Sequence, residues 1–261
     1  MRHPKRQKPP IIILKLDDLS QQNGAIVPNF VRIAKLLEER KITAGFGLIC
    51  AVTWPGAQPL AESSPEYLEQ VKRWHLSGAF EIWFHGWDHA AHVINNETCC
   101  EFYGRSYAEQ KQRFDRAQHI AQDKLGFTFT SFGAGGTISK FSSHDDNTCK
   151  VLAQDPHITN WMYPSPIDAA GQRLEATSKI KILDRVMGVN LEKGVGNPDF
   201  NWFLENYNQH PERDYFVLQG HPNPWDTDEK WQQVTKILDF LIAEKAVFMQ
   251  PSAYAATTTK K

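Results

Sequence analysis

Phe80-Glu81-Ile82-Trp83-Phe84-His85-Gly86-Trp87-Asp88-His89 is the stretch from which the rest of the chain can be interpreted. Its first half, residues 80–84, has the apolar and aromatic character of a short buried strand. His85 and His89 follow, and they would lie one above the other if this segment were helical. The pattern predicts a metal-ligating pair where a strand ends and a helix begins, the place where α/β enzymes put their chemistry.

The composition describes an ordinary globular protein. The chain has 261 residues, 23% of them charged, and a net charge of −1. That length suffices for one large core, and the weak net charge gives no support to nucleic acid as a partner. The apolar run Ile11 to Leu14 is too short for a membrane span or a signal-peptide core. We therefore expect a cytoplasmic protein, or a secreted or periplasmic one if a leader peptide is removed.

Strand and helix patterns alternate along most of the chain. Strands are predicted at residues 11–16, 44–49, 80–84, 128–132, 158–162, 180–183, 215–222 and 246–249. Helices are predicted at residues 28–37, 65–77, 107–125 and 231–241. This alternation favours a parallel α/β barrel or open sheet. We expect a basic arm at residues 1–10, a single domain at residues 11–254 and a polar tail at residues 255–261.

Five titratable side chains fall at or just beyond the C-terminal ends of predicted strands. They are Asp17, Asp18, His85, His89 and His221. In a barrel these strand ends converge on one face, where active sites form. Two imidazoles and one carboxylate make a three-ligand catalytic zinc site. The second carboxylate can take a proton from water, and a histidine on the far side can give one to a leaving group.

The order of these motifs resembles that of the polysaccharide deacetylase family, carbohydrate esterase family 4, whose domain is of the NodB type. The family motif T-F-D-D-G is similar to Lys15-Leu16-Asp17-Asp18-Leu19. The motif H-[ST]-x-x-H is similar to His85-Gly86-Trp87-Asp88-His89, and the late leucine-histidine motif to Leu218-Gln219-Gly220-His221. The chain therefore looks like a divergent member.

The resemblance implies a distorted (β/α)7 barrel from about Ile11 to Tyr254. It also implies one divalent metal ion, expected to be Zn²⁺, and an acylated carbohydrate as the substrate, from which an acyl group, expected to be acetyl, is removed. The implied roles are general base for Asp17, metal ligation for Asp18, His85 and His89, and general acid for His221.

Several positions depart from the family pattern. Leu19 replaces a glycine, Gly86 replaces a small hydroxyl residue, and two residues separate Leu218 from His221. The family's arginine-proline motif has no arginine in residues 131–136, and Arg185 is a candidate replacement.

Substrate contacts are predicted at glycines and aromatic rings. Backbone N–H groups of Gly135 or Gly136 are candidates to stabilise an oxyanion. Sugars stack on indoles, which makes Trp87, Trp161 and Trp225 candidates for substrate binding.

Two other classes of function stay open. The first is another metal-dependent hydrolase on the same barrel, a cyclic amidase or a phosphoester hydrolase. A phosphoester hydrolase should carry a lysine or arginine cluster at the strand ends, and the sequence offers no clear one. The second is a non-catalytic carbohydrate-binding module, which would have lost the base or the metal ligands. The sequence indicates no oligomeric state.

Overall fold

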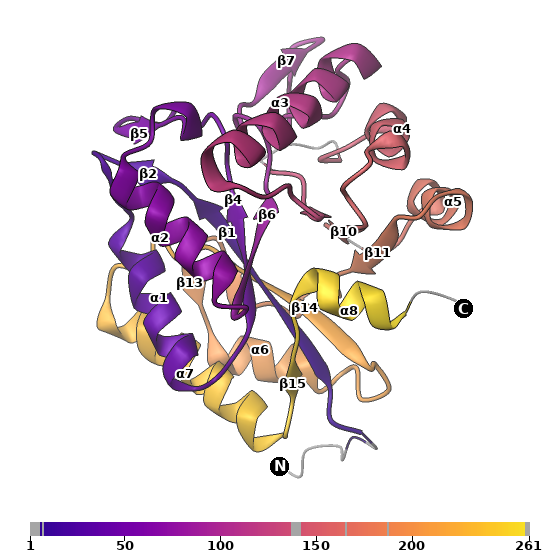
Figure 1. The fold of residues 1–261 in the computed structure, drawn as a ribbon. Coiled ribbons are helices and arrows are strands. Elements are labelled where there is room, and N and C mark those ends of the chain that lie inside the picture. Colours follow the sequence, from indigo (N-terminus) through magenta and orange to yellow (C-terminus); the bar gives the residue numbers. More distant parts are fainter. Residues whose placement is uncertain (1–5, 7, 137–141, 165, 187, 259–261) are drawn as a thin grey trace.

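Seven parallel strands form a nearly closed barrel with helices outside it (Figure 1). The computed structural model describes residues 6, 8–136, 142–164, 166–186 and 188–258. In spatial order the strands are β11 (Lys181–Asp184), β10 (Asn160–Tyr163), β9 (Ser131–Phe132), β6 (Phe80–Phe84), β4 (Ala44–Leu48), β1 (Ile11–Leu19) and β14 (Tyr215–Gly220). A short strand, β15 (Val247–Phe248), pairs with the N-terminal end of β1. The predicted (β/α)7 barrel is confirmed.

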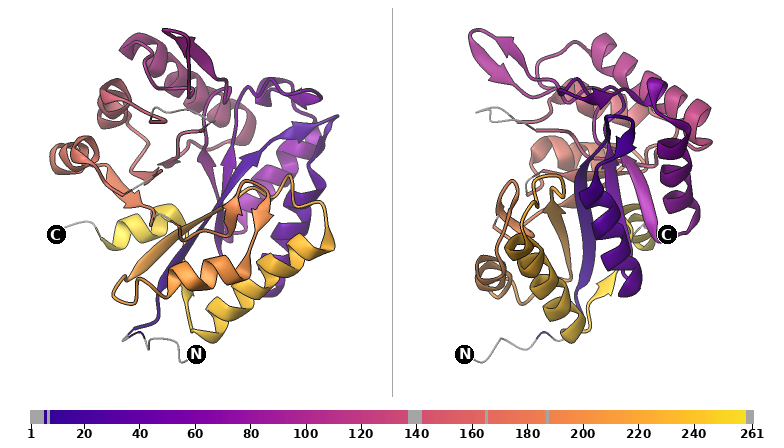
Figure 2. Two further views of the ribbon diagram at one scale, coloured as in Figure 1. Left: turned by 180° about the vertical axis from the view of Figure 1, so that it is seen from behind. Right: turned by 90° about the vertical axis from the view of Figure 1, so that its left-hand side faces the viewer.

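Helices surround these strands, and short hairpins decorate them. The helices are α1 (Pro28–Glu39), α2 (Pro65–Leu76), α3 (Tyr107–Leu125), α4 (Asp146–Gln154), α5 (Ala169–Thr177), α6 (Phe200–Tyr207), α7 (Asp228–Ala243), α8 (Pro251–Thr257) and the 3₁₀ helix η1 (Leu60–Glu62). The short strands are β2 (Gln21–Gln22), β3 (Ala25–Ile26), β5 (Ala57–Gln58), β7 (His92–Ile94), β8 (Glu97–Cys99), β12 (Glu192–Gly194) and β13 (Asn197–Pro198). Figure 2 shows the β7–β8 hairpin projecting at one end of the molecule.

Alternation along the strands separates two hydrophobic cores. Ile12, Leu14 and Leu16 on β1 belong to the larger core, which includes the buried faces of the helices. Ile13 belongs to a second core, which fills the barrel and includes Trp83. Since successive side chains of a strand point to opposite faces, residues 15 and 17 follow Ile13 into the barrel. The same alternation carries residues 85, 219 and 221 towards its mouth.

Most of the predicted strands and helices are confirmed, but the helices α4, α5, α6, α8 and η1 are not among the predicted ranges. Helices α5, α6 and α8 escaped the sequence analysis because their apolar patterns are short: α5 buries only Gly171 and Leu174. Helix α8 continues to Thr257, and the domain boundary at residue 254 stays a prediction.

The predicted basic arm is partly packed. The Arg6 guanidinium lies 4.1 Å from the centre of the Tyr207 ring and donates to the carbonyl oxygen of Arg213 at 2.9 Å. Across the described residues, we find no helix of sufficient length and apolar character to cross a membrane.

Candidate metal centre

A bulge at the end of β1 brings two neighbouring carboxylates to one place. The pairing of β1 with β4 shifts register between Leu16 and Leu19, and Asp18 has a φ of 73°. A left-handed residue in a bulge re-aims its side chain. As a result, the Asp18 Oδ1 atom lies 3.2 Å and the Asp17 Oδ2 atom 3.6 Å from the Nε2 atom of His85.

His85 follows β6 and is held in one tautomer. Its Nδ1 atom lies 2.9 Å from the carbonyl oxygen of Gly133. Since a carbonyl oxygen only accepts hydrogen bonds, Nδ1 carries a proton, and Nε2 is the nitrogen that lies beside Asp18, where it could ligate a metal ion. His89 Nε2 lies 3.7 Å from the same Asp18 oxygen.

The two histidines are joined by a loop, and the helix expected at this point is wrong. Residues 85–91 have no helical turn. Gly86 has a φ of 121° and His89 a φ of 54°, so the loop folds back and brings the rings within 5.2 Å of each other. Backbone curvature therefore replaces helical spacing as the reason that the pair converges.

The buried carboxylate of Glu101 shapes this loop. It accepts the backbone N–H of Trp87 at 2.7 Å and that of His89 at 2.8 Å. A Cβ atom on Gly86 would collide with the Glu101 carboxylate, which explains the glycine at a position where the family has a hydroxyl residue. Burial, helped by the charge of Asp88, raises the pKa of Glu101 to about 7. The sequence analysis did not identify Glu101.

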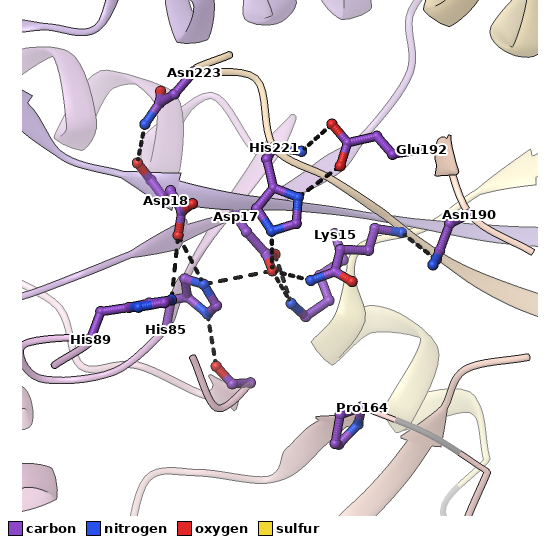
Figure 3. Close-up of polar contacts among 12 residues, drawn as sticks. Lys15, Asp17, Asp18, His85, His89, Pro164, Asn190, Glu192, His221 and Asn223 are labelled. Carbon is purple, nitrogen blue, oxygen red and sulfur yellow. Dashed lines mark hydrogen bonds and ion pairs between the residues drawn. The ribbon is translucent and has the colours of Figure 1, made fainter. Parts of the chain in front are cut away.

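Asp18, His85 and His89 fit a divalent metal ion. Their ligand atoms all lie within 4.8 Å of one another. Asp18 Oδ1 is buried without a hydrogen-bond partner among the described residues, and a buried carboxylate oxygen left so is costly unless a cation is near. One carboxylate and two imidazoles are ligands that zinc and related ions accept. Figure 3 shows the three side chains turned towards one another.

Asp17 is held from two neighbouring strands. Lys15 Nζ lies 2.7 Å from one of its carboxylate oxygens and 2.5 Å from the other, and Gln219 Nε2 donates to Oδ2 at 2.6 Å. Lys15 and Gln219 are register partners across β1 and β14. Burial by itself raises the pKa of Asp17, but Lys15, His85 and His221 together outweigh it and hold the pKa well below its usual range.

His221 is oriented by Glu192. The ring donates from Nδ1 to Glu192 Oε2 at 2.7 Å, which leaves Nε2 facing Asp17 Oδ2 at 3.8 Å. Trp225 Nε1 donates to the other Glu192 oxygen at 2.5 Å. Burial lowers the pKa of His221, but the hydrogen bond to Glu192 and the charges of Asp17 and Asp18 outweigh it and raise the pKa above its usual value. Glu192 lies on β12, which is not among the strands expected from the sequence.

Two of the three predicted stacking tryptophans are unavailable. Trp161 and Trp225 are 0% exposed, so the prediction that these rings bind sugar is wrong for this structure. Trp87 is 9% exposed, and the Arg116 guanidinium lies over its ring at 4.1 Å. Substrate stacking by Trp87 stays a prediction.

The predicted oxyanion glycines have different surroundings. Gly135 lies against the His89 ring, where an added Cβ atom would meet the imidazole at 2.5 Å. Gly136 is exposed, with nothing within 4 Å of an added Cβ atom. Their role as donors stays a prediction. Arg185 reaches Asp17 only through Gln219, so Lys15 makes the direct contact for which Arg185 was a candidate.

The fold is similar to that of several proteins of known structure, although the sequence itself finds no match. No family model and no curated protein match the sequence. Solved structures do match. A protein of Mycobacterium smegmatis assigned to the polysaccharide deacetylases is 12% identical, with a TM-score of 0.67 over 98% of this chain and 93% of that one. A family 4 acetyl xylan esterase from Clostridium thermocellum, in complex with a cobalt ion, is 13% identical, with a TM-score of 0.56 over 95% and 90%.

A third similar structure is a family 4 pseudoenzyme from Bacillus anthracis, 11% identical, with a TM-score of 0.54 over 96% of this chain and 66% of that one. At identities this low the likeness concerns the fold, and the resemblance seen in the sequence motifs is confirmed at that level. The chain has the barrel fold of the polysaccharide deacetylases of carbohydrate esterase family 4.

Proposed function

We propose that this chain is a metal-dependent hydrolase that removes an acetyl group from a carbohydrate. In this proposal Asp18, His85 and His89 hold one divalent ion, Zn²⁺ or a related metal. Asp17 is the general base and His221 the general acid, and residues 11–254 form a single catalytic domain. The observation that carries the proposal is the buried, unpartnered Asp18 Oδ1 between two imidazole nitrogens, with a second carboxylate and a third histidine beside it.

The proposed roles follow from how each side chain is held. An ion bound to this triad would polarise the acyl carbonyl and acidify a water molecule. Asp17 is ionised and fixed by Lys15 and Gln219, so it can accept a proton without first having to move. Glu192 accepts a hydrogen bond from His221 Nδ1–H and, with the charges of Asp17 and Asp18, favours the protonated ring. In that form Nε2–H faces the site, so it can donate to the leaving group.

Two alternative functions, a non-catalytic binding module and a cyclic amidase, make different use of these residues. A non-catalytic binding module has no use for the acids and histidines, and this chain keeps all five. One similar structure is nevertheless a pseudoenzyme, so catalysis has to be measured. A cyclic amidase would use the same ion and the same base. The choice of substrate separates it from a carbohydrate deacetylase.

The test is a metal titration of two matched variants, Asp17→Asn and Asp18→Asn, followed by assays of acetate release from acetylated oligosaccharides. Asparagine keeps the volume of each side chain and removes its charge. We expect Asp17→Asn to bind metal and lose activity by ~10²–10⁴. We expect Asp18→Asn to bind metal weakly and to regain part of its activity in excess metal.

Two outcomes would contradict the proposal. Full activity of Asp17→Asn would exclude the general-base role, and unchanged metal affinity of Asp18→Asn would exclude that ligand. Hydrolysis of cyclic amides, with no acetate release from any sugar, would favour the alternative enzyme.

A further inference from the structure

A cavity of about 440 Å³ opens beside His221. Gln219 and His221 belong both to its wall and to the site described above. Figure 3 shows two further wall residues, Pro164 and Asn190, across Asp17 from His85 and His89. A group bound in this cavity would therefore lie next to the proton donor.

Arg185 brings a positive charge to this cavity, and among the described residues Asp17 acts on it only at longer range, without a direct ion pair. Its guanidinium donates to the carbonyl oxygen of Pro164, from Nε at 2.9 Å, and to the side-chain oxygen of Gln219. Both acceptors are neutral. Among the residues that the structure describes, no carboxylate lies within 4.0 Å of the guanidinium. A guanidinium has five donors, and a partly buried one gains most from an anion.

The acids nearest to the cavity are already engaged. Glu192 binds His221 and Trp225, and Asp17 binds Lys15 and Gln219. Lys193, exposed on the cavity wall, adds a second positive charge. The cavity therefore favours an anion, in contrast to the acidic metal centre, which lies on the other side of His221 and Gln219.

One wall of the cavity offers an aromatic ring. Trp202 lines it and is partly exposed, unlike the buried Trp161 and Trp225. An indole at a cavity wall can pack against the apolar face of a sugar ring. A guanidinium pairs with a planar carboxylate through two parallel hydrogen bonds.

We infer that this cavity binds a carboxylate carried by the acylated sugar, with Arg185 as the anchoring cation and Trp202 as the wall for the sugar ring. The inference rests on the proposed deacetylase function and names its substrate class: an acidic acetylated amino sugar. In this inference Arg185 binds the substrate carboxylate, whereas Lys15 and Gln219 hold the proposed base, Asp17, in position.

The test compares matched acidic and neutral sugars by calorimetry, on the metal-loaded Asp17→Asn variant so that no turnover interferes. The probes are N-acetylglucosaminuronic acid, with its carboxylate on C6, and N-acetylmuramic acid, with its carboxylate on the O3 substituent. Each is compared with its carboxamide. We expect at least one acid to bind about 10- to 100-fold more tightly than its amide. Arg185→Gln should abolish that preference, and Trp202→Ala should weaken both members of the pair.

Controls separate the other roles that Arg185 could have. Arg173→Gln removes an exposed arginine that pairs only with the exposed Asp146, and it should leave the preference intact. Arg185→Lys keeps the charge and should retain part of it if the glutamine variant is unstable. Turnover is measured separately, with Asp17 intact. If Arg185→Gln then lowers turnover equally on acid and amide, while binding to the Asp17→Asn protein is unchanged, Arg185 is a support of Gln219 and the inference is overturned.

Two further outcomes are decisive. Equal binding of both acids and their amides would overturn the inference. Tighter binding of N-acetylglucosamine 6-phosphate than of either acid would assign the cavity to phosphate and overturn it as well. If the acids are preferred but no acetate is released, the cavity assignment stands and the proposed function fails.

Discussion

The carboxylate of Glu192 decides how His221 is presented to the site. One oxygen accepts a hydrogen bond from His221 Nδ1–H, and the other accepts one from the N–H of the Trp225 indole. Trp225 is thus a support for this carboxylate. Together with Asp17 and Asp18, Glu192 surrounds the imidazole with negative charge and favours its protonated form.

We predict that Glu192→Gln lowers turnover and moves the alkaline limb of the pH–activity profile to lower pH. A donor must be protonated, and its raised pKa extends that state to higher pH. Without the Glu192 charge the pKa falls, so His221 loses its proton earlier as the pH rises. His221→Ala should reduce turnover further, by ~10²–10⁴. The measurements are pH–rate profiles and metal content.

Metal loss in His221→Ala would make this histidine a ligand, and another residue would have to be the general acid. An unshifted alkaline limb in Glu192→Gln would mean that another group controls it.

At this scale the sequence predicts what a motif carries and misses what only the fold supplies. Asp18, His85 and His89 stand in short motifs, and the structure brings them together. Lys15 lies two residues before Asp17, and this spacing puts both side chains on one face of the strand, but it does not show that they form an ion pair. Glu101 lies in an irregular segment and Glu192 on a strand of three residues, and neither is long enough for a periodicity to indicate which way a side chain points.

The loop of residues 85–91 is the element on which the metal centre depends most. Two of its backbone N–H groups, those of Trp87 and His89, donate to one buried carboxylate, and its glycine has a φ that other residues rarely adopt. A helix here would have used the i, i+4 spacing of the histidines. The glycine and the buried Glu101 favour a tight loop instead, which sequence periodicity could not show.

We predict that Gly86→Ala lowers metal affinity by about 10- to 100-fold while the barrel stays folded. The new methyl group would collide with the Glu101 carboxylate and strain a backbone with φ of 121°. The measurement is metal affinity by calorimetry, with circular dichroism as the check on folding. Gly194→Ala is the control, because nothing lies within 4 Å of a Cβ atom there. Equal metal affinity in the two variants would show that Glu101 and this backbone conformation do not set the ligand geometry.

Across the whole molecule, side chains close the barrel where the backbone leaves it open. Strands β11 and β14 stand at the two ends of the strand order. Arg213 Nη2 donates to the side chain of Asp184 at 2.8 Å and to its carbonyl oxygen at 2.9 Å. The Tyr215 hydroxyl donates to the same carboxylate. This cluster joins the two strands.

We predict that Arg213→Met lowers the free energy of unfolding by about 1–3 kcal/mol without changing metal content, because it leaves a partly buried carboxylate without its cation. Arg173→Met is the control, since its ion pair is exposed at 65% and 75%, and it should stay within about 0.5 kcal/mol of the parent. The measurement is denaturant unfolding. Equal stability of the two variants would mean that the cluster does not contribute to barrel closure.

The main strands could be expected from the sequence because most of them are compact apolar runs between turns, whereas the seven-stranded barrel is implied by the family resemblance. Glu192 on β12 and the helix α5 could not, since short elements with few apolar residues resemble loops. The gap between β11 and β14 also leaves no sequence signal. Tertiary contacts such as the ion pair of Arg213 with Asp184 bridge this gap.

The pairing of β1 with β14 has a consequence for the time course of folding. Its ladder joins Ile11 to Tyr215 and Leu16 to Gly220. A ribosome adds about 5–20 residues per second, so the Ile-rich first strand waits on the order of ten seconds for this neighbour. Until then the backbone N–H and C=O groups on one edge of β1 are unpaired and can bond to another segment or another chain. Gln219 lies on β14 and His221 follows it. A nascent chain that binds an ion before β14 is synthesised therefore has the metal ligands but lacks both Gln219 and His221.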